Sequence, residues 1–123
     1  MSSPSLEAYI GSIQSHHPTV PAIVDAGSAT RILESLFGGN AIDMSTIKTG
    51  DFPNLFVYDV PEGKSEFNIA TVHMVQKDMS MTPYDGKSIF VLNHFDRANH
   101  HAQNALLKSL EDHPSYAVIL LVV

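Results

Sequence analysis

Two neighbouring segments near the C-terminus carry the clearest pattern in this sequence. The first reads SIFVL, residues 88–92, a serine followed by four consecutive apolar residues. A run of this kind is typical of a strand that is buried on both faces of a parallel sheet. The second reads ANHHAQNALLKSLE, residues 98–111, in which alanine and leucine recur at intervals of three or four residues. That spacing predicts a helix with one apolar face.

The rest of the chain repeats this alternation of strand and helix. The further strands that we predict are residues 20–24, 55–60 and 116–123. The further helices are residues 6–15, residues 69–79 and a helix through Ile32 and Phe37 that ends at Gly38-Gly39. Strands that alternate with helices indicate an α/β fold, a parallel sheet of about four strands with helices on both faces.

Length and composition predict one domain over residues 1–123. The chain ends inside an apolar run, so we expect it to be the N-terminal part of a longer protein. Its formal net charge is −6, which makes it a poor nucleic-acid binder on its own, because phosphate binding needs clustered lysine and arginine. No apolar run approaches the about 18 residues that span a membrane. The first residues show no positive region followed by an apolar run, so we expect no signal peptide and a cytoplasmic protein.

The helical segment carries a recognisable motif. Residues 104–111 read NALLKSLE and follow a buried strand that ends in NHFDR, residues 93–97. This block resembles the AAA+ module of bacterial clamp-loader subunits, the delta-prime and gamma/tau subunits of DNA polymerase III, over about residues 67–123. The resemblance implies a P-loop NTPase (AAA+) fold, a Rossmann-like three-layer sandwich with a mostly parallel sheet, here truncated before its last strand.

The sequence departs from that family at the phosphate-binding loop. A working loop reads Gly-x-x-x-x-Gly-Lys-Ser/Thr, whose backbone amides surround phosphate and whose lysine neutralises it. The equivalent turn here is residues 25–31, DAGSATR, with one glycine and no Gly-Lys pair. Asp25 would repel phosphate, and Arg31 is the one candidate to replace the lysine. The degenerate loop positions are Gly27, Ser28, Ala29, Thr30 and Arg31.

The Walker B position departs as well. Active relatives end this strand in Asp-Glu, which hold Mg²⁺ and polarise water, whereas this chain has Asn93 and His94. Asparagine is a weak ligand for Mg²⁺, which prefers carboxylates, and His94 stands where a general base belongs. We assign no catalytic residue. No metal ligand is assigned either, because the clustered histidines lack the i,i+4 spacing of a shared zinc site. We expect Asp96 to cap the helix that follows.

These departures, taken with the resemblance, imply a delta-prime-like, non-catalytic subunit of the clamp-loader complex. It would help load the sliding clamp as part of the polymerase holoenzyme, without ATPase activity or a cofactor of its own. The implied partners are other clamp-loader subunits, with the sliding clamp and DNA reached through the complex and no membrane involved. Asn104, Lys108 and Glu111 fall on one helix face and are candidates for a subunit contact; the alternative is a solvated ion pair.

Two other functions remain open at this point. The first is a gamma/tau-like motor subunit with a divergent site, which would bind and hydrolyse Mg-ATP. The second is a standalone scaffold that keeps only the AAA+ shell.

Overall fold

The computed structural model describes residues 21–60, 66–81, 87–111, 114 and 116–123. The predicted helix over residues 6–15 lies outside these ranges. Within them, strands and helices alternate along the chain. The elements are β1 (Ala22–Val24), α2 (Ala26–Leu36), β2 (Leu55–Tyr58), α3 (Ile69–Met79), β3 (Ser88–Leu92), the 3₁₀ turn η1 (Phe95–Arg97), α4 (His100–Glu111) and β4 (Ala117–Val122).

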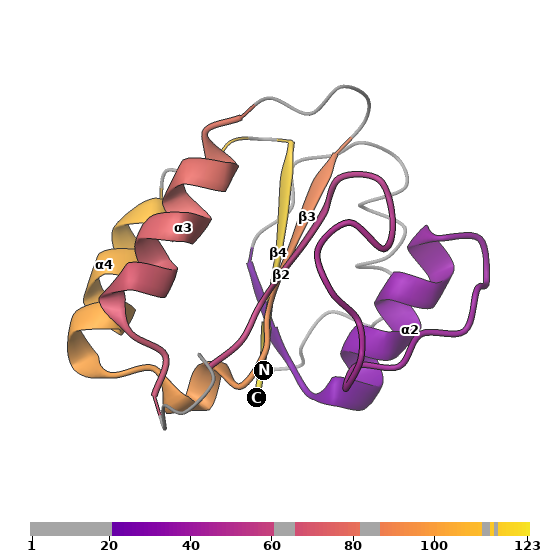
Figure 1. The fold of residues 1–123 in the computed structure, drawn as a ribbon, viewed down its shortest axis with the longest axis horizontal. Coiled ribbons are helices and arrows are strands. Elements are labelled where there is room, and N and C mark those ends of the chain that lie inside the picture. The colour runs from indigo at the N-terminus through magenta and orange to yellow at the C-terminus, as the bar shows by residue number, and fades with distance from the viewer. Residues whose placement is uncertain (1–20, 61–65, 82–86, 112–113, 115) are drawn as a thin grey trace, which may run out of the picture.

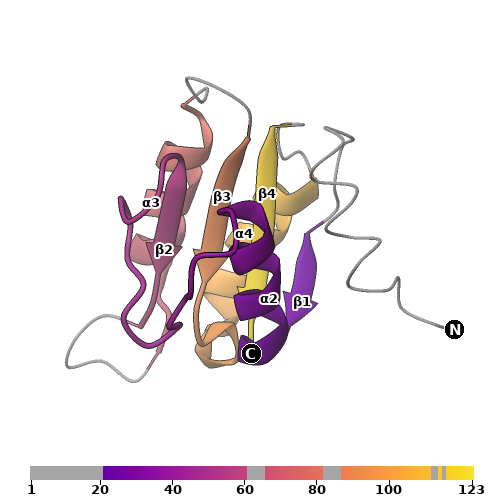
Figure 2. The ribbon, with the colours of Figure 1, turned by 90° about the vertical axis from the view of Figure 1, so that its right-hand side faces the viewer.

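The four strands form one parallel sheet in the order β1-β4-β3-β2. Helices α3 and α4 cover one face of the sheet, and α2 with the segment that follows it covers the other (Figure 1). The described strands β1 and β2 stand at opposite edges (Figure 2). The predicted α/β sandwich with a parallel sheet and helices on both faces is therefore confirmed.

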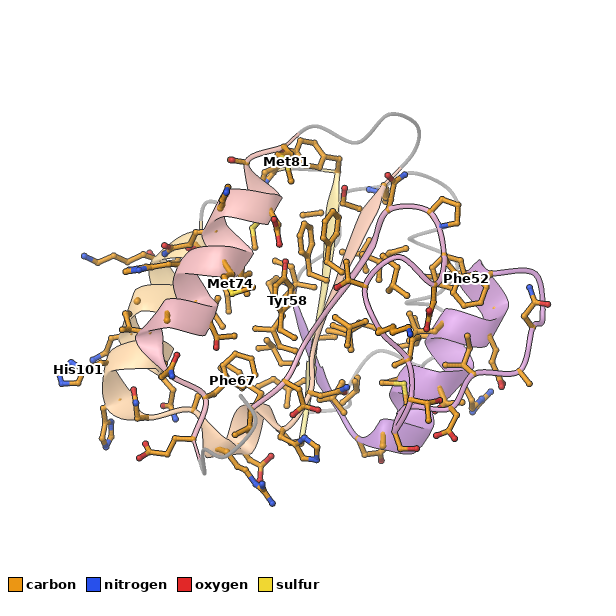
Figure 3. All side chains as sticks on the ribbon, viewed as in Figure 1. Phe52, Tyr58, Phe67, Met74, Met81 and His101 are labelled. Atoms are coloured by element: carbon orange, nitrogen blue, oxygen red, sulfur yellow. The ribbon has the colours of Figure 1, made fainter. Side chains whose placement is uncertain are left out.

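The continuous apolar runs of β3 and β4 are explained by the two faces that these strands serve. Alternate side chains of a strand point to opposite faces. Phe90 and Ile119 accordingly pack toward α3 and α4, whereas Val91 and Leu120 pack toward α2. All four side chains are fully buried or nearly so. Figure 3 shows Tyr58 and Phe67 between the sheet and the two helices, and His101 pointing outward from α4.

Helix starts are set by side-chain caps. Asn68 caps α3, its Oδ1 accepting from the backbone N of Thr71 at 3.1 Å. Asn99 acts in the same way for α4, accepting from the backbone N of Ala102 at 2.8 Å. The expectation that Asp96 caps α4 is therefore wrong: Asp96 lies in η1. Short polar side chains directly before the first turn satisfy the free N–H groups there, and Asn99, not Asp96, holds that position.

The segment between α2 and β2 covers the outer edge of the sheet. It leaves α2 through Gly38 and Gly39, which both have positive φ, and its Phe52 ring stacks on Phe37 at 4.3 Å between centroids. Its Thr49 hydroxyl accepts from Val57 N of β2 at 2.8 Å and donates to Val57 O at 3.3 Å. The Thr49 side chain thereby forms hydrogen bonds with backbone groups of Val57 that would otherwise stay unpaired at the edge of the sheet.

Candidate functional site

The residues that follow the strands meet at one edge of the sheet. Parallel strands bring their carboxyl ends to the same edge, which is where α/β proteins place ligands. Here Asp25 follows β1, Asp59 follows β2, Asn93 and His94 follow β3, and Val123 follows β4. This edge holds the predicted Walker B positions and the start of the predicted phosphate loop.

The junction between β1 and α2 is shorter than we expected. Strand β1 ends at Val24, Asp25 is the N-cap, and the helix begins at Ala26. The Asp25 carboxylate accepts from Ser28 N at 2.7 Å, and its carbonyl accepts from Ala29 N at 3.0 Å. Hydrogen bonds from Ser28 hold the pKa of the Asp25 carboxyl below its usual value, so the group is negative at neutral pH.

The expected turn over residues 25–31 is therefore wrong, because Gly27, Ser28, Ala29, Thr30 and Arg31 all lie inside α2. Ala29 is fully buried in the core on that face of the sheet, and Thr30 Oγ1 donates to Ala26 O at 2.8 Å. A Cβ added at Gly27 would meet the Asp25 carboxylate at an ordinary 3.5 Å. Gly27 thus marks no loop; an N-cap followed by helix-compatible residues starts the helix instead.

This junction does not fit a nucleotide phosphate chain. A phosphate loop offers several backbone N–H groups and a positive helix end. Here the Ser28 N–H is taken by Asp25, and the Asp25 carboxylate sits at the helix end where the anion would bind. Neither residue directly after β3 is a carboxylate that could hold Mg²⁺, since positions 93 and 94 are asparagine and histidine. The residues at this edge therefore do not match the donor set of a site for ATP and its metal.

The end of β3 contains a contact that the sequence did not reveal. His94 Nδ1 lies 2.6 Å from Oδ1 of Asp59, and both side chains are about half exposed. His94 has φ 55° and ψ 40°, in the left-handed region. The register that pairs Tyr58 with Leu92 brings the residues after the two strands together. Only knowledge that β2 and β3 are neighbours would have linked these two residues.

Asn93 is the most buried polar residue of this edge, at 6% exposure, and its backbone N donates to Tyr58 O at 2.8 Å. It lines a cavity of about 250 Å³ together with residues from the ends of β1 and β4 and the segment before β2. The lining residues are Ala26, Met44, Ser45, Asn93, His94, Val122 and Val123. The cavity is mostly apolar, and lysine and arginine are absent from that lining.

The predicted contact residues lie on the other face of the sheet. Asn104, Lys108 and Glu111 are all exposed on α4, which packs with α3 against the face opposite α2. They are not brought together with residues 27–31. Within the described ranges, no three histidine or carboxylate side chains come together as a metal site. None of the described helices is both long and apolar enough to cross a bilayer.

The fold of this chain is similar to that of a solved protein. A crystal structure of a DNA polymerase III gamma subunit-related protein from Thermotoga maritima MSB8 superposes with a TM-score of 0.68 at 18% identity. The match covers 98% of this chain and 39% of that protein, and at this identity it establishes the fold alone. No curated protein matches the sequence. The model of the family described as DNA polymerase III, delta subunit, matches residues 28–123. The chain therefore belongs to the DNA polymerase III delta subunit family.

Proposed function

We propose that this chain is a non-catalytic, delta-prime-like subunit of a DNA polymerase III clamp loader. The observation that carries the proposal is the β1–α2 junction. The helix begins one residue after the Asp25 cap, and the carboxylate of that cap stands where phosphate would bind. A subunit with this junction contributes shape and surface to an assembly and leaves ATP hydrolysis to its neighbours. DNA and the sliding clamp are then reached through the assembly, since the chain itself is acidic.

The contact with a neighbouring subunit is assigned to the exposed face of α4. Asn104, Lys108 and Glu111 are solvent-exposed there, on a helix held firmly to the body of the domain. Gln76 of α3 donates from Nε2 to Ser109 Oγ at 2.9 Å, and Leu106 is fully buried beneath. A rigid helix can present these polar groups to a partner at little ordering cost.

Reconstitution of the complex tests this proposal. The full-length protein is mixed with the gamma/tau and delta subunits of the same organism, and assembly is followed by native mass spectrometry. We expect the protein to enter the complex, and Lys108→Glu to weaken its incorporation by about tenfold or more, because like charges brought together at an interface are costly. Lys48→Glu, an equal charge reversal on the opposite side of the sheet, serves as the matched control.

The outcomes separate the two parts of the proposal. Failure of the wild-type protein to enter any complex would contradict the subunit role and favour a standalone scaffold. Incorporation that Lys108→Glu and Lys48→Glu affect equally would contradict the assignment of the contact to α4 and leave the subunit role intact.

A further inference from the structure

Helix α3 carries a second set of apolar side chains besides the face, around Val75, that is buried in the core. Ala70 and Met74 are exposed on the helix, and Met81 is exposed just beyond its end (Figure 3). Met74 is 58% exposed and Met81 is 50% exposed. Ser80 keeps helical backbone angles, so the intervals of four and seven residues place these side chains on one side of the helix. A surface helix needs one apolar face to pack on its own core, so the fold of this chain does not explain the second set.

The charge on this side of α3 is positive. Lys77 is exposed and lies between Met74 and Met81, and no ion pair joins it to another of the described residues. Asp78 is the one carboxylate of α3, and it is held toward the sheet, since its Oδ2 accepts from the Tyr58 hydroxyl at 2.5 Å. A partner that covers the outer row, defined as Ala70, Met74, Lys77 and Met81, must therefore supply a carboxylate or leave the ammonium group in water.

The helix that carries the outer row is tied to the domain at several points. Asn68 caps its first turn, and Asp78 joins it to β2. Gln76 joins it to α4, donating from Nε2 to Ser109 Oγ at 2.9 Å. A partner can bind to this surface without first ordering α3, which lowers the entropic cost of association.

The spacing of the outer row indicates what kind of partner would fit. The row advances by alternating steps of four and three residues, the pattern by which one helix packs along another. Methionine is enriched at the centres of interfaces and adapts its shape to the partner. A second copy of this chain fits poorly, because two outer rows packed antiparallel would bring their Lys77 side chains together, and like charges at an interface are costly.

We infer that the outer row of α3 docks an amphipathic helix of another protein, which carries acidic side chains beside its apolar stripe. This surface would be used in the helix-on-helix mode of peptide recognition. The inference does not rest on the proposed clamp-loader role, which assigns a subunit contact to the exposed residues of α4.

The test measures how two synthetic peptides bind to the full-length protein, by fluorescence anisotropy. Both peptides form a helix of about four turns with the same leucine stripe, flanked by glutamate in one peptide and by lysine in the other. We expect the glutamate peptide to bind about tenfold more tightly than the lysine peptide, because its flank alone complements Lys77. Sedimentation velocity of the protein by itself checks for self-association.

Variants assign the binding to α3. Met74→Gln keeps the length of the side chain but removes apolar surface, and should weaken binding of the glutamate peptide by about tenfold, the worth of burying one methionine. Lys77→Glu should reverse the order of the two peptides. Ile23→Gln and Lys48→Glu make the same kinds of change at exposed positions away from α3, and should leave binding unchanged.

The proposal is overturned if neither peptide binds, if both bind equally well, or if the two α3 variants bind the glutamate peptide as the wild type does. Self-association that Met74→Gln abolishes would identify a second copy of this chain as the occupant, and would likewise overturn the choice of an acidic partner.

Discussion

A single residue, Tyr58, links the strand β2 to the helix α3. Its ring is buried at the end of β2, and its hydroxyl donates to Asp78 Oδ2 of α3 at 2.5 Å. Burial, followed by the bond to and the charge of Asp78, raises the pKa of the Tyr58 hydroxyl well above its usual value. The hydroxyl therefore stays protonated and joins a strand to the helix that covers it.

Removing that hydroxyl should be costly. Tyr58→Phe leaves the half-buried Asp78 carboxylate without its donor, and we expect a loss of about 1–2 kcal/mol in the free energy of unfolding. Tyr116→Phe is the matched control, because Tyr116 donates to a neutral carbonyl, Met79 O, at 2.9 Å, and a bond to an uncharged acceptor is worth less. Urea denaturation measures both variants. Equal losses in the two variants would show that the charge of Asp78 adds nothing to the hydrogen bond. No loss in Tyr58→Phe would show that the contact with Asp78 does not stabilise the fold.

The raised pKa also predicts a pH dependence. Above the ordinary tyrosine pKa of 10.0, unfolded Tyr58 loses its proton while folded Tyr58 keeps it. The folded state then binds more protons, so Tyr58 makes stability fall as pH rises, by up to about 1.4 kcal/mol per pH unit. Below that pH its contribution is constant. Urea denaturation between about pH 9 and 11 should show a steeper loss for wild type than for Tyr58→Phe. Parallel curves would contradict the pKa shift.

At the site, residue patterns predicted some positions and misplaced others. The motif that precedes α4 correctly put Asn93 and His94 at the end of a buried strand. It could not reveal the contact of His94 with Asp59, because strand order is a property of the whole sheet. The supposed turn at Gly27 failed for a local reason: Asp25 is an N-cap, and that signal outweighs one glycine in the first turn.

At the level of the elements, the apolar periodicity predicted where helices and strands lie, and capping residues decided where some of them begin. α3 and β3 begin and end where the apolar spacing predicted. α4 begins at His100, two residues after the prediction, because Asn99 caps it. β2 ends at Tyr58 instead of residue 60. Apolar spacing identifies an element, whereas the polar residue beside it decides where the element begins.

The Thr49 side chain protects the backbone of the edge strand β2. Thr49→Val removes the hydroxyl that pairs with Val57 N and Val57 O, so we expect a loss of about 1–2 kcal/mol. The exposed edge should also promote association between copies. Denaturation and light scattering measure the two effects. Thr46→Val is the control, since the Thr46 hydroxyl makes only a 3.4 Å contact with Asp43 O. Unchanged stability and scattering in Thr49→Val would refute the protective role.

At the scale of the whole molecule, the fold was predictable because two kinds of evidence agreed. Continuous apolar strands indicate a sheet covered on both faces, and the described sheet has a core on each face. The NALLKSLE block indicated the same architecture, and the family match over residues 28–123 is consistent with it. The proposed function rests instead on local departures from the family pattern at the carboxyl edge, where Asp25 caps α2 directly after β1.

The proposed non-catalytic role requires that the protein does not bind nucleotide, and thermal unfolding of the full-length protein with and without saturating Mg-ATP tests this requirement most directly. A ligand at 100 times its Kd stabilises by about 2.7 kcal/mol, which in a domain of this size raises Tm by several degrees. Because Asp25 occupies the start of α2, we predict no shift in Tm. A rise of several degrees that Arg31→Ala abolishes would contradict the proposal and identify a motor subunit.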